Sequence, residues 1–210
     1  MKTTSIKNWE IGKTPSALES IHQQDVNIAI YERDTSKLKA EIDSLLEQNI
    51  ERRAKGDIDT ILGEITQAIK PEKHSLIIED IKALLHLFQE VSQAKSIRLL
   101  LATVNVNMCR KFHTDVNDMR MLCTYSGPGT LWLKEDNINR DAMNAAGLNE
   151  AIVLDQDKIQ QVETGAAILL KGALYPKEGT RAVVHRSPTI EESGQKRLLL
   201  RIDTHEFMTF

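Results

Sequence analysis

The sequence predicts an α+β fold in which an N-terminal helical layer packs on a double-stranded β-helix sheet of the jelly-roll, cupin-like kind. Two observations predict it. The first half of the 210-residue chain has three amphipathic segments of helical period, and the second half has short apolar segments separated by turns of glycine and proline. We expect residues 1–95 to form the mainly helical layer and residues 96–210 to form the jelly-roll region, integrated into one domain.

The helical expectation depends on the spacing of aliphatic side chains. In residues 36–54 they recur at helical intervals, with charged residues on the opposite side. Residues 57–69 repeat the pattern behind Asp57, a residue type that caps helix N-termini, and residues 75–94 form the third segment. Residues 26–32 alternate and predict a short strand. Three apolar helix faces need a surface to cover, and a sheet is the natural partner.

The second half of the chain is rich in β-branched and aliphatic residues, and SGPGT (126–130) is typical of a tight turn. Segments of strand length separated by such turns predict a barrel or a double sheet. The segments of strand length are SIRLLLATVNVN (96–107), RMLCTY (120–125), AIVLD (151–155), GAAILLKG (165–172), RAVVH (181–185) and RLLLRID (197–203).

Composition excludes several classes of protein. The net charge is −3 with acidic and basic residues mixed, so we expect no nucleic-acid partner. Two cysteines, Cys109 and Cys123, exclude a disulfide framework and a cysteine-rich zinc site. The first residues do not resemble a signal peptide, and the longest apolar runs are too short to span a bilayer. We therefore expect a cytoplasmic protein without a membrane partner. The substrate, small molecule or protein, and the oligomeric state are not indicated.

Residues 111–118, KFHTDVND, carry a candidate metal-binding pair. In extended chain, His113 and Asp115 project to the same face with Cα atoms roughly 6.6 Å apart. One imidazole and one carboxylate at this spacing reach a common cation at about 2.0 to 2.2 Å. Such a pair occurs often by chance, so a third ligand decides its meaning.

His185 is the best candidate for that third ligand, because it ends a second apolar segment and distant strands lie side by side in a jelly roll. Two histidines and one carboxylate form the facial triad of non-haem Fe(II) oxygenases, which leaves positions open for other ligands. His205 is the main rival. Cys109 shares the parity of His113 if residues 109–115 form one strand, and its thiolate would favour zinc, although a small buried hydrophobe is the simpler interpretation. We expect His86 to be a core histidine on a helix.

Two arginines and a tyrosine are candidates for binding an anion. Arg197 and Arg201 lie four apart in an expected strand and so share a face, while Leu198, Leu200 and Ile202 take the other. Burying two guanidinium groups is costly without an anion, and their geometry suits a carboxylate. The alternative is that this face is solvent-exposed. Tyr125 is a further candidate to donate a hydrogen bond to a bound carboxylate.

The order His113-x-Asp115, His185 and a basic residue on the next strand resembles the pattern of Fe(II)/2-oxoglutarate-dependent dioxygenases. The resemblance implies that the three ligands hold Fe(II) and that Arg197 or Arg201 binds the distal carboxylate of 2-oxoglutarate. Arg197 is nearer to His185 and therefore nearer to the usual spacing in that superfamily.

A closer resemblance covers most of the chain. CRKFHTDVNDMRMLCTYSGPGTLWL (109–133), ILLKG (168–172) and VVHRSP (183–188) are similar to the bacterial domain-of-unknown-function family DUF1826. That family has no established activity, and its association with zinc-homeostasis genes keeps zinc open as the metal. Three functions remain: an Fe(II)/2-oxoglutarate oxygenase, a non-catalytic metal-binding protein of zinc homeostasis, and a cupin-like module without metal. Three ligands favour catalysis, whereas a fourth from Cys109 or His205 favours a structural site.

Overall fold

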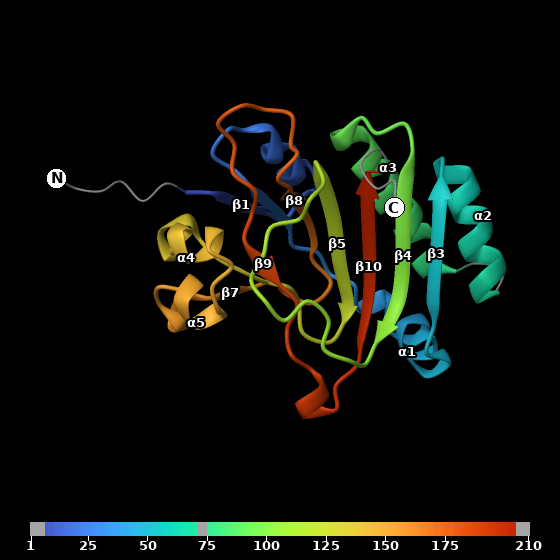
Figure 1. The fold of residues 1–210 in the computed structure, drawn as a ribbon. Helices are drawn as coiled ribbons and strands as arrows, with labels where there is room; N and C mark the ends of the chain where they lie inside the picture. The colour runs from blue at the N-terminus through green and yellow to red at the C-terminus, as the bar shows by residue number, and fades with distance from the viewer. Residues whose placement is uncertain (1–6, 71–74, 205–210) are drawn as a thin grey trace.

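A seven-stranded sheet in the order β1-β2-β8-β5-β10-β4-β3 forms the centre of the computed structural model, which describes residues 7–70 and 75–204 (Figure 1). Neighbouring strands are antiparallel except β1 and β2, which are parallel. The strands are β1 (Trp9–Gly12), β2 (Ile28–Tyr31), β3 (Glu51–Gly56), β4 (Ile97–Val104), β5 (Met119–Ser126), β8 (Ala167–Lys171) and β10 (Arg197–Thr204).

A second, small sheet faces part of the large one. It consists of β7 (Gln160–Gln161), β6 (Leu131–Trp132) and β9 (His185–Arg186), with β6 in the middle. Buried side chains of both sheets, among them Trp132 and Ile168, form one apolar cluster between them. We call the side of the large sheet that meets this cluster its inner face.

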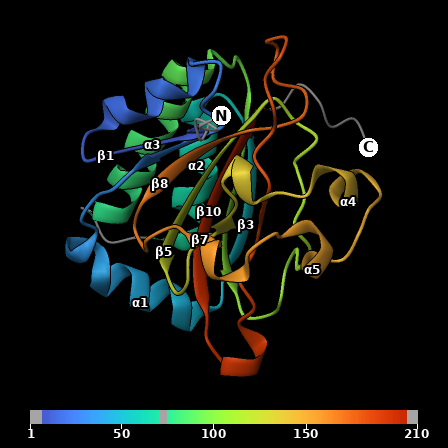
Figure 2. The same ribbon diagram turned by 90° about the vertical axis from the view of Figure 1, so that its left-hand side faces the viewer.

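Helices cover the opposite side of the large sheet, which we call the helix face. The helices are α1 (Lys39–Gln48), α2 (Ile58–Ile69) and α3 (Leu76–Ser92), and their buried side chains join those of the sheet in the largest apolar cluster. Figure 2 shows α1 and α3 on one side of the sheet and the short helices α4 (Arg140–Asn144) and α5 (Asn149–Ile152) on the other. Segments of 3₁₀ helix complete the described elements: the eight-residue Pro15–His22 and the single turns Ser36–Leu38, Glu135–Asn137, Gln156–Lys158 and Glu191–Ser193.

Local sequence explains the second and third helices. The Asp57 carboxylate accepts the Thr60 N–H at 2.8 Å, which confirms the expected N-cap, and the Ser75 hydroxyl caps the third helix by accepting the Ile78 N–H at 3.3 Å. Buried isoleucines three or four positions apart give α2 its apolar stripe. Lys70 adopts a left-handed conformation and ends α2. The helices expected in 57–69 and 75–94 are confirmed.

Three expectations about elements are wrong. The helix expected over 36–54 ends at Gln48, where Asn49 turns into a left-handed conformation, and β3 follows. β3 pairs with β4, which satisfies backbone groups that β4 would otherwise expose at the sheet edge.

Two expected strands are absent. Residues 151–155 do not form a strand, because α5 ends at Ile152 and only Val153 makes an isolated bridge, with Ile138. Residues 181–184 are not in a strand either, and β9 begins at His185.

The first 95 residues therefore supply three strands to the large sheet, β1, β2 and β3, in addition to the three helices. This mixture of helices with one large sheet agrees with the expected α+β class. None of the helices within residues 7–70 and 75–204 has the length and apolarity that crossing a bilayer requires.

Strand β10 shows how the sheet distributes side chains between its faces. Leu198, Leu200 and Ile202 belong to the cluster of the helix face, whereas Leu199 belongs to the cluster of the inner face. Alternation therefore directs Arg197 and Arg201 to the inner face. Both arginines thus point to the side on which the small sheet lies.

Candidate metal centre

His113 and His185 lie directly opposite each other, although 72 positions separate them in the chain. Each donates its backbone N–H to the carbonyl oxygen of the other at 3.0 Å, which makes an isolated antiparallel bridge. Residues paired in this way project to the same side, and the two ring centroids are 4.7 Å apart. The backbone thus brings the two imidazoles together.

The loop that carries His113 and Asp115 is anchored on both sides. Asn149 accepts the Phe112 N–H at 2.8 Å and donates to the Arg110 carbonyl at 2.9 Å. Gly172 meets the loop closely, because a Cβ there would lie 2.0 Å from the carbonyl oxygen of Asn117. These contacts fix the loop position and were not identified from the sequence.

Hydrogen bonds to backbone carbonyls determine which ring nitrogens are free. The Nδ1 of His113 lies 2.9 Å from the Lys111 carbonyl oxygen, and the Nδ1 of His185 lies 3.4 Å from that of Val183. A carbonyl oxygen only accepts, so each Nδ1 carries the proton and each Nε2 keeps its lone pair. This is the tautomer of a histidine that binds a metal through Nε2.

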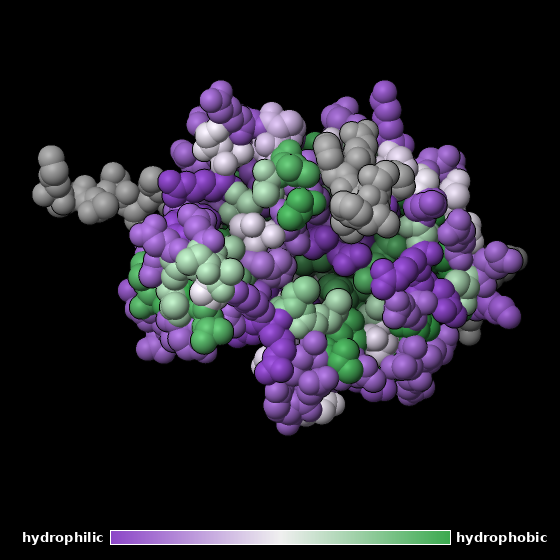
Figure 3. Space-filling model, viewed as in Figure 1, coloured by the Kyte–Doolittle hydropathy of each residue, from purple (hydrophilic) through white to green (hydrophobic). Residues whose placement is uncertain are grey.

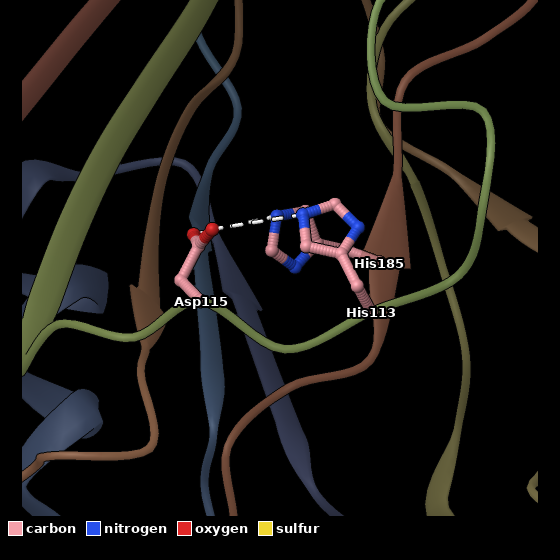
Figure 4. A group of neighbouring side chains, drawn as sticks. All are labelled: His113, Asp115 and His185. Carbon is pink, nitrogen blue, oxygen red and sulfur yellow. Dashed lines mark ion pairs between the residues drawn. The ribbon is translucent and has the colours of Figure 1, made fainter. Parts of the chain in front are cut away.

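Asp115 completes the group (Figure 4). Its Oδ1 lies 3.6 Å from the Nε2 of His113, and its Oδ2 lies 3.4 Å from the Nε2 of His185. The three ligand atoms all lie within 4.8 Å of one another. Oδ2 is buried and accepts no hydrogen bond from the residues that the structure describes. Lone pairs that face one another without a donor are unfavourable, and a cation between them would satisfy all three.

The electrostatics keep Asp115 ionised and His185 neutral. Burial by itself would raise the pKa of Asp115, but His113, His185 and Arg120 outweigh it and lower the pKa to about 2. Burial lowers the pKa of His185 to about 4, which leaves its imidazole neutral at neutral pH. Contact with Asp115 raises the pKa of His113 above its ordinary value. A carboxylate and a neutral imidazole are the protonation states that a metal needs.

Arg120 on β5 holds the carboxylate from behind. Its Nη1 lies 2.6 Å from the Oδ1 of Asp115, and its Nε donates to Asp203 at 2.5 Å. Burial would lower the pKa of Arg120, but Asp203 and Asp115 together raise it. The sequence did not identify Arg120 as a site residue. Its spacing of two from Leu122 in RMLCTY puts both side chains on one face of a strand but does not indicate which residue Arg120 binds.

A cavity of about 50 Å³ lies against this group. Met108, Cys109 and Ser187 border it together with both histidines, Arg120, Arg197 and Arg201. The structure therefore brings both candidate arginines to the cavity that His113 and His185 line.

Arg197 is buried with few partners. It is 1% exposed, and the only side-chain hydrogen bond among the described residues runs from its Nη2 to the Thr124 hydroxyl at 3.0 Å. Its Nε has no partner among the described residues, and burial lowers its pKa to about 10. Arg201 is different, because its Nε lies 2.9 Å from the Oδ2 of Asp203 in an ion pair, although the geometry is not that of a hydrogen bond. Arg197 is thus a buried cation beside the cavity that has no carboxylate partner among the described residues.

Tyr125 is not at this site, which corrects the expectation. Its side chain lies on the helix face, and its hydroxyl donates to Asp80 of α3 at 2.6 Å. β5 directs Arg120 and Thr124 inward, and Tyr125 has the opposite parity. Burial raises the pKa of its phenol well above the ordinary value.

Two histidines and both cysteines were also considered in the sequence. His205 lies outside the described residues. Cys109 is exposed, so the interpretation as a buried hydrophobe is wrong; it borders the cavity but is not in the group of converging ligand atoms found among residues 7–70 and 75–204. Cys123 is buried, as expected. His86 is exposed on α3, so the expectation of a core histidine is wrong.

Comparison with known proteins agrees with this description. The family model of "Protein of unknown function (DUF1826)" matches residues 12–203. Among curated proteins, none matches the chain by sequence.

Two solved structures share the fold. A dioxygenase for auxin oxidation from Arabidopsis thaliana, in its complex with 2-oxoglutarate, superposes with a TM-score of 0.56 at 9% identity, over 97% of this chain and 94% of that one. A prolyl-4-hydroxylase from Pseudomonas putida gives 0.51 at 9% identity, over 90% and 97%. At such identity the likeness shows the fold alone.

Proposed function

This chain belongs to the DUF1826 family, and we propose that it is an Fe(II)- and 2-oxoglutarate-dependent oxygenase on a double-stranded β-helix. One observation carries the proposal. His113, Asp115 and His185 offer three ligand atoms within 4.8 Å of one another, and the Asp115 Oδ2 is buried with no hydrogen-bond donor. This donor set is the one that non-haem Fe(II) oxygenases use. When bound, Fe(II) and 2-oxoglutarate supply the chemistry for inserting oxygen from dioxygen into a substrate.

Arg197 supports the choice of cosubstrate. A guanidinium that is 1% exposed and has no carboxylate partner among the described residues is costly unless an anion binds to it. Arg197 would hold the distal carboxylate of 2-oxoglutarate, and the Thr124 hydroxyl beside it would orient the guanidinium. Leu199 and Leu122 line the same cavity and exclude water from this contact.

The cavity has to widen for this cosubstrate. A volume of about 50 Å³ holds one or two water molecules, and 2-oxoglutarate is larger. Met108 and Cys109, which border the cavity, belong to the segment between β4 and β5 that has no regular secondary structure. The proposal requires these side chains to move when the cosubstrate enters.

Calorimetric titration of 2-oxoglutarate into the anaerobic Fe(II) protein tests the proposal. We expect binding to the Fe(II) form and none to the metal-free form. His185→Ala should abolish it, whereas His86→Ala, which changes an exposed histidine far from the ligand group in the chain, should leave it unchanged. If the wild type does not bind 2-oxoglutarate at millimolar concentration, the oxygenase proposal is wrong. Metal analysis of protein purified without tag or chelator then decides whether zinc occupies the ligands.

A further inference from the structure

A second, larger hollow lies on the inner face of the large sheet, between the metal centre and the edge strand β3. Its volume is about 470 Å³, and residues of β3, β4, β10 and α2 line it. Four cations, Arg53, Lys55, Arg98 and Arg201, and two carboxylates, Glu64 and Asp203, border it. Figure 3 shows the surface hollowed in front of β10 and β4, with hydrophilic residues along its margin.

The register of the strands explains why these charges gather. Lys55 pairs with Arg98, and Arg98 pairs with Asp203, which pairs in turn with Arg120. Paired residues project to the same face, so this row runs along the inner face from the sheet edge to the metal centre. In the adjacent row, Arg53 pairs with Leu100, which pairs with Arg201.

Among the described residues that line the hollow, cations outnumber carboxylates. Four cations face two carboxylates, and Asp203 is already engaged by Arg120 at 2.5 Å and by Arg201 at 2.9 Å. Like charges on adjacent strands destabilise a sheet unless an anion compensates them. Arg53 binds Glu51 at 2.8 Å, but both side chains are more than half exposed, so this pair is weak and a ligand can replace it. Leu100 and Ala54 add apolar lining.

The hollow adjoins the metal centre. Arg201 borders both the 50 Å³ cavity at the histidines and the 470 Å³ hollow. Asp203 lines the hollow and binds Arg120, whose Nη1 lies 2.6 Å from the Asp115 carboxylate. The side chains of Asp203 and Arg120 therefore lie between a molecule in the hollow and the Asp115 carboxylate.

We propose that this hollow binds the primary substrate and that the substrate is a small organic oxyanion, a carboxylate or phosphate on an apolar body. Arg53, Lys55 and Arg201 would bind the anionic group, and Leu100 would contact the apolar part. Calling the ligand a substrate rests on the proposed oxygenase function, whereas the anion site itself depends only on the hollow. Guanidinium groups bind both oxyanions through paired N–H donors.

The test uses two anions, benzoate and phenyl phosphate, with the neutral molecules benzamide and benzyl alcohol as matched probes. Each is titrated into metal-free, ¹⁵N-labelled protein, and the amide signals of Ala54, Leu99 and Leu100 are followed. We expect saturable shifts with at least one anion and none with the neutral probes. The stronger anion identifies the substrate as carboxylate or phosphate. Absence of saturable shifts with both anions overturns the proposal.

Two charge reversals on β3 distinguish a built site from general attraction. Arg53 pairs with Leu100 on the inner face, whereas Arg52 pairs with Leu101, which belongs to the cluster of the helix face. Both arginines are exposed at the sheet edge, so Arg53→Glu and Arg52→Glu change net charge equally with little effect on folding. Arg53→Glu should weaken anion binding about tenfold or more, and Lys55→Glu should act similarly. Arg52→Glu should leave it within about twofold. Equal losses in both variants would overturn the proposal.

The two proposals fail separately. Binding of 2-oxoglutarate should require Fe(II) and Arg197, whereas binding of the probe anion should require neither. If 2-oxoglutarate binds but neither probe does, the substrate site is wrong and the oxygenase stands. If a probe anion binds at the hollow but 2-oxoglutarate does not bind, the hollow is an anion site of a protein that is not this oxygenase.

Discussion

Two arginines, the part-buried Arg33 and the fully buried Arg197, lie on opposite faces of the same sheet and differ in their partners. On the helix face, Arg33 donates to both oxygens of Asp80, at 2.6 and 2.9 Å, and to the Gly165 carbonyl at 2.8 Å. Burial would lower its pKa, but Cys123, Asp80 and Tyr125 raise it above its ordinary value. On the inner face, Arg197 has one neutral hydroxyl partner, and its pKa falls to about 10.

This difference in hydrogen-bond partners distinguishes charged residues that stabilise the fold from charged residues that bind a ligand. A buried charge whose donors are all bonded belongs to a structural network, here one that joins β2, α3 and β5. A buried charge that lacks its counterion costs free energy in the empty protein and recovers it when an anion binds. The same contrast holds for Asp80, which is fully engaged, and Asp115, whose Oδ2 has no donor.

The largest expected effect is on the helix face. Arg33→Met leaves the Asp80 carboxylate without its guanidinium, and we expect the free energy of unfolding to fall by about 3 to 5 kcal/mol. Urea unfolding followed by circular dichroism measures it. The double variant Arg33→Met with Asp80→Leu, which removes both charges, should recover much of the loss. A loss below about 1 kcal/mol in the single variant would show that this network does not stabilise the fold.

Arg197→Met should have the opposite profile. Removing a buried, poorly bonded cation should leave the free energy of unfolding unchanged or raised. Binding of 2-oxoglutarate to the Fe(II) protein should weaken by about 2 to 5 kcal/mol, with little change in metal affinity. Calorimetry on this variant and on Arg201→Met tests the assignment. If Arg201→Met loses more affinity for 2-oxoglutarate than Arg197→Met, then Arg201 and not Arg197 binds the distal carboxylate.

Arg120→Met should weaken metal binding about 10- to 100-fold, because Arg120 orients the Asp115 carboxylate. The positive charge of Arg120 repels the metal, so removing it would by itself strengthen metal binding, but Asp203 already neutralises much of that charge. Competition titration with Co(II) measures the affinity, and circular dichroism confirms that the variant is folded. Unchanged or tighter binding would show that orientation is not the dominant effect.

Tyr125→Phe tests the placement of this residue on the helix face. Loss of the hydrogen bond to the Asp80 carboxylate should cost about 1.5 kcal/mol of unfolding free energy. The affinity for 2-oxoglutarate should not change, because Tyr125 is on the other side of the sheet from the cavity. Weaker binding of 2-oxoglutarate with an unchanged free energy of unfolding would show that Tyr125 lies at the binding site after all.

The last effect concerns Lys171, which is buried on β8 and donates to the Gln23 carbonyl at 2.7 Å. Burial lowers its pKa from 10.5 to about 8. Between these pH values the unfolded chain binds more protons than the folded one, so the free energy of unfolding should rise with pH. A shift of this size corresponds to a rise of about 3 kcal/mol, because each pKa unit is worth about 1.4 kcal/mol. Urea unfolding across this range should show the rise in wild type and not in Lys171→Met.

Local sequence by itself determined the helices of 57–69 and 75–94 and the alternation of β10. The capping residue and the spacing of apolar side chains that predict each helix lie within the helix segment itself. In β10, side chains alternate between the two faces, so Arg197 and Arg201 share a face whatever the rest of the fold is. The pair His113 and Asp115 could likewise be predicted from the sequence, because both residues lie in one short segment. The DUF1826 resemblance, carried by the sequence alone, is confirmed over residues 12–203.

Tertiary structure decided which side of the sheet each alternating set occupies. The period of β5 shows that Arg120 and Thr124 share a face and that Cys123 and Tyr125 share the other, but strand pairing alone assigns one face to the metal centre and the other to α3. The backbone bridge that unites His113 with His185 is likewise non-local. Residues 51–56 became β3 because the edge of β4 offered unpaired backbone groups, and a period of apolar residues does not reveal such an edge.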